Sequence, residues 1–251
     1  MKIGITFASV HEEYGKDPIR ALDEIKDAGY ELFEIARYDK LSRDDFVRAL
    51  KERSIQPISG HFAWPDFEDD MFEDTLRFAG AFGIDTIVMP WVHPEDIQTY
   101  ESTLEAAKKL DALAEKLARR GFKLLFHNHM VEFEIKHNGK SVMEIFLENT
   151  SLVGFELDLG WAHAGGCEDI VAFIKKLGDR LHIIHIKDVR EGRIPTEIGT
   201  GLVNMKECID AAAAVGVRYG IVEQDVATEK RRFPPFESIR ISRSNLRSMG
   251  Y

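Results

Sequence analysis

The feature that most constrains the fold is a regular alternation, along the whole chain, of short β-like segments with longer helical ones. The helical patterns close at glycines such as Gly29, Gly83 and Gly121, which are typical helix C-caps. We expect strands at residues 2–10, 30–37, 55–61, 85–91, 122–129, 152–159, 181–189 and 218–225. We expect helices at residues 18–29, 42–53, 69–82, 100–120, 141–149, 168–177, 204–215 and 236–249.

These are eight strand–helix units of about 31 residues each, which suits a (β/α)8 TIM barrel, typically about 250 residues long. A doubly wound open sheet is the alternative, but it usually has fewer units and a glycine-rich first turn. Here the first turn reads Ala8-Ser-Val-His-Glu, without a GxGxxG pattern. No linker or low-complexity tract divides the chain. We therefore expect a single α/β domain, a TIM barrel over residues 1–251.

Composition and charge exclude several classes of protein. The 44% hydrophobic and 30% charged residues are typical of a globular protein, and the net charge of −10 argues against an extended nucleic-acid surface. Cys167 and Cys208 lack CxxC spacing and are expected to be reduced thiols. The first residues lack the apolar core of a signal peptide, and no run of about 18 apolar residues occurs. We expect a cytoplasmic protein with no nucleic-acid or membrane partner; a homo-oligomer remains open.

The seventh expected strand, Leu181-His-Ile-Ile-His-Ile-Lys-Asp-Val189, carries polar residues at its C-terminal end. Strand alternation places Ile183, His185 and Lys187 on one face. Burying an unpaired imidazole or ammonium costs several kcal/mol. A metal ion or an anionic ligand would explain these residues; a strand end that emerges into solvent is the alternative.

Catalytic groups of such barrels collect at the C-terminal ends of the strands. One group from each of the last four strand ends gives Glu132, Asp158, His185 and Glu223, at intervals of 26, 27 and 38 residues, each about one strand–helix unit. Three carboxylates and an imidazole would repel and desolvate one another without a cation. Mixed oxygen and nitrogen ligands suit Mn²⁺, Mg²⁺ or Co²⁺. Glu134, with the same strand parity, is the alternative to Glu132; Asp158 could instead cap the next turn.

A second set of polar and aromatic residues near the strand ends is assigned to substrate binding. His127 and His129 could be ligands, but a His-x-His pair often serves hydrogen bonding instead. Lys187 could bind a substrate oxygen, or form an ion pair with Glu156 or Asp188. Glu34 is a further candidate for contacts with substrate hydroxyls. The assigned substrate-binding residues are His61, His127, His129, Trp161 and Lys187.

Four motifs occur in order at the ends of the last four expected strands: His127-Asn-His-Met-Val-Glu-Phe, Phe155-Glu-Leu-Asp-Leu-Gly-Trp, His185-Ile-Lys-Asp and Ile221-Val-Glu-Gln-Asp. Together they resemble the xylose-isomerase-like TIM-barrel superfamily of sugar phosphate isomerases and epimerases, and the resemblance covers nearly the full chain. The resemblance implies one divalent ion held by Glu132, Asp158, His185 and Glu223. It also implies that the ion is Mn²⁺, with Mg²⁺, Co²⁺ or Zn²⁺ as alternatives. Ketose 3-epimerases usually have a His three positions after the Asp ligand, where this chain has Trp161.

The expected function is therefore a divalent-metal-dependent isomerase or epimerase of a small sugar or sugar derivative. The ion would stabilise a metal-bound enediolate while Glu132 and Glu223 remove and return the proton. A lyase or dehydratase acting on keto-inositols or 3-keto-glycosides is the first alternative. An endonuclease IV-like nuclease and a catalytically silent sugar-binding protein are further ones. The Gly199-Thr-Gly201 loop follows the seventh strand, where many barrels bind phosphate, but we expect a plain connecting loop.

Overall fold

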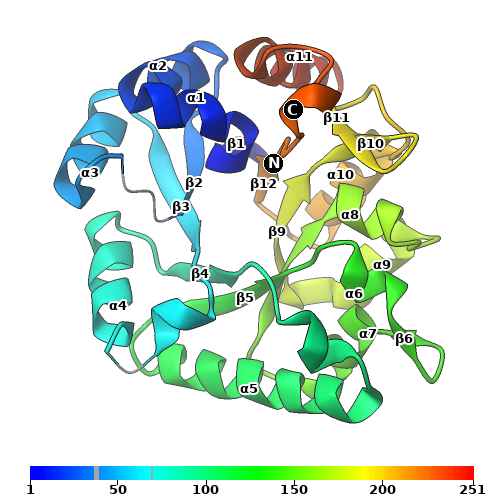
Figure 1. Cartoon of the computed structure of the whole chain (residues 1–251). Coiled ribbons are helices and arrows are strands. Elements are labelled where there is room, and N and C mark those ends of the chain that lie inside the picture. The colour runs from blue at the N-terminus through cyan, green and yellow to red at the C-terminus, as the bar shows by residue number, and fades with distance from the viewer. Residues whose placement is uncertain (37–39, 69) are drawn as a thin grey trace.

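Eight parallel strands pair side by side into a closed barrel, in the order β1-β12-β9-β8-β5-β4-β3-β2, in the computed structural model of the chain (Figure 1). The structure describes residues 1–36, 40–68 and 70–251. The strands are β1 Lys2–Thr6, β2 Leu32–Ala36, β3 Gln56–His61, β4 Thr86–Met89, β5 Lys123–His127, β8 Gly154–Asp158, β9 Leu181–Ile186 and β12 Tyr219–Val222. The expected single (β/α)8 TIM barrel is confirmed.

Helices surround the barrel, and each follows the strand that the sequence assigns to it (Figure 1). The long ones are α2 Pro18–Asp27, α3 Arg43–Glu52, α4 Phe72–Ala81, α5 Tyr100–Ala118, α7 Val142–Asn149, α9 Ile170–Leu177, α10 Met205–Ala214 and α11 Pro235–Ser248. Three short helices, α1 His11–Lys16, α6 Val131–Glu134 and α8 Leu159–Ala164, lie in the loops that follow strands β1, β5 and β8. Among the helices of the described residues, none has the length and apolarity needed to cross a membrane.

Two antiparallel hairpins extend the connections after β5 and β9. One joins β6 Lys136–His137 to β7 Lys140–Ser141, and the other joins β10 Asp188–Arg190 to β11 Ile194–Thr196. The second hairpin begins directly after the motif that first marked a site in the sequence, so the polar end of β9 leads into an ordered, paired loop.

Several expected strands are longer than the observed ones. The first ends at Thr6, and Phe7–Val10 forms a 3-10 turn whose Phe7 ring packs edge-on against Phe33 at 4.4 Å between centroids. The strand expected to reach residue 129 ends at His127, and the chain then turns into α6. The prediction that Glu132 and Glu134 share a strand face was therefore wrong, because both residues lie on a helix. The expected boundaries at residues 37 and 69 fall outside the described residues.

Alternation along the strands builds distinct layers inside the barrel. Val88, Leu125, Ile183 and Ile221 form a small buried apolar cluster. Two residues further along β5 and β9, the same face carries His127 and His185, and Glu223 follows Ile221 in the same way. The shared face of Ile183 and His185 confirms the alternation read from the sequence. The barrel interior therefore changes from apolar to ionisable as the strands approach their C-terminal ends.

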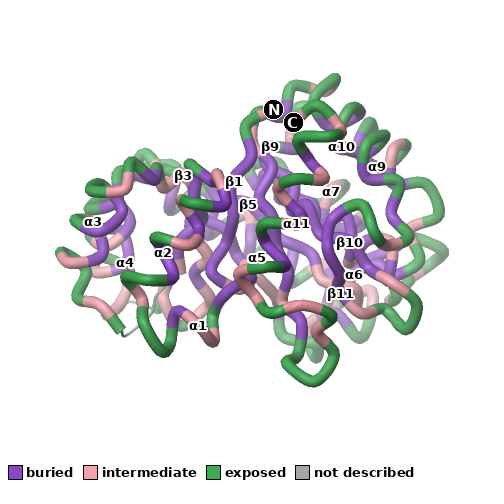
Figure 2. The backbone as a smooth tube through the Cα atoms, turned by 90° about the horizontal axis from the view of Figure 1, so that it is seen from above, coloured by how far each residue is buried: buried purple, intermediate pink, exposed green. Residues whose placement is uncertain are grey.

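A second, larger apolar core fills the space between the strands and the helices. Figure 2 shows the strands buried in the middle of the molecule, with exposed backbone mainly on the outer sides of the helices and in the loops. The helices are amphipathic, so each buries one apolar stripe against the sheet. This outer core fixes the strands, and the strands in turn fix the ionisable residues at the barrel mouth.

Candidate metal centre

Charged residues are almost never fully buried without a partner, yet a group of them is buried at the barrel mouth. They come from β2, β5, β8 and β9, from the residue that follows β9, and from the residue that follows β12. The group comprises Glu34, His127, Glu156, Asp158, His185, Lys187 and Glu223, all of them below one tenth exposed.

The structure brings together three of the four predicted metal ligands, Asp158, His185 and Glu223. These three residues and His127 each offer one ligand atom, and the four atoms all lie within 4.8 Å of one another. We call these four residues the outer group. His185 Nδ1 lies 2.8 Å from Glu223 Oε2. Asp158 also caps α8, because its Oδ1 accepts a hydrogen bond from the Trp161 N–H at 2.7 Å. The two roles considered for Asp158 are therefore compatible.

Glu132, the fourth predicted ligand, is buried but lies outside the groups of possible ligand atoms found in the described residues. Its Oε2 accepts a hydrogen bond from the His129 N–H at 2.8 Å. Burial raises the pKa of Glu132 to about 7, although backbone N–H groups oppose the shift. Glu134 instead pairs at the surface with Arg193. The assignment of Glu132 to the metal remains a prediction, with His127 in the position expected for it.

Lys187 is completely buried and faces three carboxylates. Its Nζ lies 3.0 Å from Asp158 Oδ2, 3.1 Å from Glu223 Oε2 and 2.9 Å from Asp225 Oδ1. These partners replace Glu156 and Asp188, the ones considered from the sequence. None of the three contacts has hydrogen-bond geometry, so Lys187 Nζ and Asp158 Oδ2 are buried without a hydrogen-bond partner among the described residues. The two atoms form an ion pair with each other at 3.0 Å, but incomplete hydrogen bonding of buried polar atoms is still costly.

The charges of the outer group fit a divalent cation. Burial raises the pKa of Asp158 to about 7, with Lys187 opposing the shift. Burial would also raise the pKa of Glu223, but Lys187 and His185 together hold it well below its usual range. Mixed carboxylate and imidazole donors, with one buried oxygen lacking a hydrogen bond, are suitable ligands for Mn²⁺, Zn²⁺ or Co²⁺. Asp158, His185 and Glu223 are the residues that would hold the ion.

Below the outer group lies a second set of contacts, which we call the inner ring: Glu34, His61, Glu156 and His185. His61 Nε2 lies 3.0 Å from Glu34 Oε1 and 2.9 Å from Glu156 Oε1. His185 Nε2 lies 2.7 Å and 2.9 Å from the same two oxygens. His61 was expected to contact substrate, but here its Nε2 is engaged by carboxylates. Sequence reasoning did not assign Glu156 to the site, although it shares strand parity with Asp158 and so had to face the barrel interior.

The remaining predicted substrate-binding residues are divided between the interior and the mouth. His127 is buried, and its Nδ1 lies 3.1 Å from Glu156 Oε1. His129 and Trp161 are partly exposed, with ring centroids 6.4 Å apart. The Trp161 ring also lies 4.2 Å from Lys187 Nζ. Burial lowers the pKa of His127 to about 4 and that of His129 to about 3, so both imidazoles are neutral at pH 7.

The loop at Gly199–Gly201 is held from within the protein. The backbone N–H groups of Gly199 and Gly201 each donate to Asp188 Oδ2 at 2.9 Å. A side chain at Gly201 would collide with the Asp188 carboxylate and the Val189 carbonyl oxygen. Because Asp188 already binds these donors, they are not free to bind a phosphate, as expected for a connecting loop.

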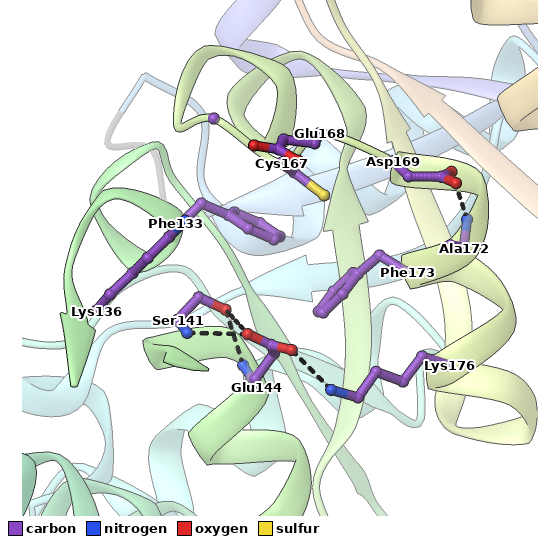
Figure 3. A pocket seen from close by; sticks show the side chains of 11 residues that line it. Phe133, Lys136, Ser141, Glu144, Cys167, Glu168, Asp169, Ala172, Phe173 and Lys176 are labelled. Atoms are coloured by element: carbon purple, nitrogen blue, oxygen red, sulfur yellow. Dashed lines mark hydrogen bonds and ion pairs between the residues drawn. The ribbon is translucent and has the colours of Figure 1, made fainter. Parts of the chain in front are cut away.

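A cavity of about 360 Å³ lies outside the barrel, and its lining differs from that of the barrel mouth (Figure 3). Phe133 and Phe173 face each other across it, and Glu144 pairs with Lys176 at 2.7 Å on its wall (Figure 3). Burial raises the pKa of the Cys167 thiol there to about 11, so the thiol stays protonated at neutral pH and is a poor nucleophile. We therefore place the candidate site at the barrel mouth.

Comparisons with known proteins agree with this architecture. A curated relative, the inosose dehydratase of Mesomycoplasma hyopneumoniae, is 26% identical over 238 residues, covering 86% of this chain and 74% of the relative. The structure of a sugar phosphate isomerase/epimerase from Parabacteroides distasonis superposes with a TM-score of 0.83 at 22% identity, covering 98% of this chain and 93% of that one. The IOLI protein with a bound zinc atom gives a TM-score of 0.69 at 18% identity, covering 99% and 98%. Residues 22–248 match the sequence profile of the family described as "Xylose isomerase-like TIM barrel", and the chain therefore belongs to that family.

Proposed function

We propose that the protein is a divalent-metal-dependent isomerase or epimerase of a small keto sugar or a related polyol. The observation that carries this proposal is the outer group: Asp158, His185 and Glu223 converge in a buried site, and Asp158 Oδ2 has no hydrogen bond within the described part of the chain. The zinc atom named with the IOLI structure and the sugar isomerase/epimerase named above support the same class.

The ion would be held by Asp158, His185 and Glu223, with Glu132 as the predicted fourth ligand and His127 as its alternative. When bound, a divalent ion acidifies the proton next to a carbonyl by stabilising negative charge on the oxygen. Mn²⁺ is the ion expected from the family resemblance, and the zinc of the IOLI structure makes Zn²⁺ the first alternative.

Two carboxylates are placed to move the proton. Glu132 lies on α6, after β5, and its pKa of about 7 suits a group that must both accept and release a proton near neutral pH. Glu223 follows β12 and stays ionised. Because these elements are far apart in the barrel order, the two groups can approach a substrate from different sides. One would remove the proton and the other would return it.

The other residues would bind and orient the substrate. The Lys187 ammonium would donate to a substrate oxygen and balance the negative charge that develops there. Trp161 and His129, partly exposed at the mouth, would pack against the sugar ring. The centre of the Trp161 ring lies 4.2 Å from Lys187 Nζ, so a sugar packed against Trp161 would lie near the ammonium group.

A dehydratase is the second candidate, favoured by the name of the inosose dehydratase relative. The first step, removal of a proton beside a carbonyl, is common to both reactions. The difference comes afterwards, when a β-hydroxyl leaves and takes a proton. Glu132, with a pKa near neutrality, could supply that proton.

Solvent deuterium exchange tests the shared step. Keto sugars, inososes and 3-keto-glycosides would be incubated in D₂O with the metal-loaded protein and followed by proton NMR. We expect deuterium at the carbon next to the carbonyl, and we expect exchange to require the metal and to fall in Glu132→Gln and Glu223→Gln. Glu134→Gln is the matched control, since Glu134 lies on the same helix but pairs with Arg193 at the surface. Product formation without solvent deuterium would contradict the two-carboxylate scheme.

A further inference from the structure

The inner ring contains more close nitrogen–oxygen contacts than its imidazole N–H groups can turn into separate hydrogen bonds. Its four facing atoms alternate between nitrogen and oxygen: His61 Nε2, Glu34 Oε1, His185 Nε2 and Glu156 Oε1. The four neighbouring pairs are 2.7–3.0 Å apart. Each imidazole Nε2 carries at most one proton, so at most two protons must serve four close contacts. Two of the contacts are hydrogen bonds, from His61 to Glu156 and from His185 to Glu34, and the other two have no hydrogen bond of their own.

A cation at the centre would serve all four contacts at once. In a square with sides of this length the centre is about 2.0 Å from each corner, close to the usual distances from zinc to histidine nitrogen and carboxylate oxygen. Zinc prefers a tetrahedral arrangement, in which donor atoms lie about 3.3 Å apart, so the four side chains would each have to move outward by a few tenths of an ångström. The His127 Nδ1, 3.1 Å from Glu156 Oε1, is a further nitrogen beside this centre.

The charges of the inner ring and the hydrogen bonds around it also favour a bound cation. Glu34 and Glu156 are fully buried and together carry two negative charges. Protonated His61 and His185 balance these charges in the metal-free protein, and a divalent ion would balance them in place of the histidine protons. Ser59 donates to Glu34 Oε2 at 2.6 Å, which leaves Oε1 directed at the ring, as outer hydrogen bonds commonly orient metal ligands. Glu156 Oε2 is buried and has no hydrogen-bond partner among the described residues, an atom that two-oxygen coordination would satisfy.

We propose that the inner ring is a second divalent-cation site, separate from the outer group and joined to it through His185. The two ring nitrogens of His185 face the two sites, since Nδ1 lies 2.8 Å from Glu223 and Nε2 contacts Glu34 and Glu156. With both sites filled, His61 releases its Nε2 proton to solvent, and His185 releases both of its ring protons and bridges the ions as an imidazolate. The two ions would then lie about 6 Å apart, from metal–nitrogen distances of about 2.1 Å on either side of the ring. The imidazole nitrogens favour Zn²⁺ over Mg²⁺. This site does not depend on the proposed reaction.

Metal stoichiometry tests the proposal. The full-length protein would be loaded with Zn²⁺, freed of excess by gel filtration and analysed by plasma mass spectrometry. We expect two ions per chain in the wild type and one in Glu34→Gln, which removes an inner-ring charge. We also expect one ion in Asp158→Asn, which removes an outer-group ligand. Glu31→Gln, an exposed carboxylate beside β2, is the control and should keep two.

The possible results separate the two sites. One ion in the wild type that is lost in Asp158→Asn and kept in Glu34→Gln overturns the inner site and leaves the proposed function intact. One ion lost only in Glu34→Gln supports the inner site and removes the metal from the proposed function. No bound ion overturns both. Anomalous diffraction from Zn²⁺-soaked wild-type crystals needs no variant: two peaks about 6 Å apart support the bridge, and a single peak in the outer group contradicts it.

Discussion

Lys187 and Asp188 are consecutive residues, both buried and both charged, yet their surroundings are opposite. The Asp188 carboxylate accepts four backbone hydrogen bonds, from the N–H groups of Val189, Gly199 and Gly201 at 2.9 Å and of Val203 at 3.1 Å. The Lys187 ammonium has close ionic contacts but no hydrogen bond in the described structure. Asp188 therefore stabilises the loop that follows β9, whereas Lys187 faces carboxylates of the candidate metal site.

The same contrast repeats one strand away, between Glu223 and Gln224. The Gln224 side chain donates to Ser238 Oγ and accepts from Ser242 Oγ, both at 3.0 Å, and so ties the barrel to α11. Glu223 instead faces His185 and Lys187 in the barrel mouth. At these two strand ends, the first residue faces the ionisable group of the barrel mouth, and the next residue makes hydrogen bonds that hold the surrounding structure together. Residue types alone do not reveal this difference.

We expect the largest effect to be a loss of turnover when Glu223, which faces the barrel mouth, is replaced. Glu223→Gln should lower turnover about 10²–10⁴-fold, because an amide cannot exchange a proton, while the thermal midpoint stays near that of the wild type. Gln224→Leu should do the reverse, destabilising the protein while the folded fraction remains active. Initial rates and thermal unfolding of both variants would check this. Turnover of Glu223→Gln within a factor of about ten of the wild type would contradict the acid–base role.

A change at Asp188 should give the largest loss of stability. Asp188→Asn replaces one accepting oxygen with a donor and leaves backbone N–H groups buried without partners, at a cost of about 3–4 kcal/mol. Urea unfolding would measure it, with Glu191→Gln as control, since Glu191 is exposed and three residues away. A loss below about 1 kcal/mol would mean that the loop finds other partners.

Glu132 should make the metal-free protein less stable as pH rises. Burial raises its pKa from 4.5 to about 7, so between these values the unfolded chain ionises first and the folded state loses stability. The cost reaches roughly 3 kcal/mol above pH 7. Glu132→Gln removes it, so the variant should be more stable than the wild type at pH 8 and nearly equal at pH 5. Unfolding in EDTA at both pH values tests this, and a pH-independent difference would show that ionisation of Glu132 is not the cause.

Removal of divalent ions should have the smallest effect on stability. An ion at 100 times its dissociation constant stabilises the folded state by about 2.7 kcal/mol, so EDTA should lower the thermal midpoint of protein saturated with Mn²⁺. The shift should shrink in Asp158→Asn, which lacks a ligand. An equal shift in that variant would place the stabilising ion elsewhere.

The amino-acid sequence by itself determined the barrel and most of the candidate site. The alternation of strand and helix patterns is local, and in a closed parallel barrel it leaves little freedom in how the units are arranged. Strand periodicity then directs Asp158 and His185 inward, and Glu223 follows with the same parity. These residues could be identified because their directions depend only on their own strands.

Only the tertiary structure decided which side chains of the candidate site contact one another. After β5 the chain turns into α6, so His127 rather than Glu132 joins the outer group, and strand parity beyond residue 127 had no meaning. Lys187 pairs with carboxylates from β8 and from beyond β12, and Glu156 meets His61 across the barrel. The loop path after β5 depends on distant packing, since a side chain at Gly165 would collide with the Met130 carbonyl oxygen. Strand direction follows from local alternation, but contacts across a barrel depend on register and loop packing among residues far apart in sequence.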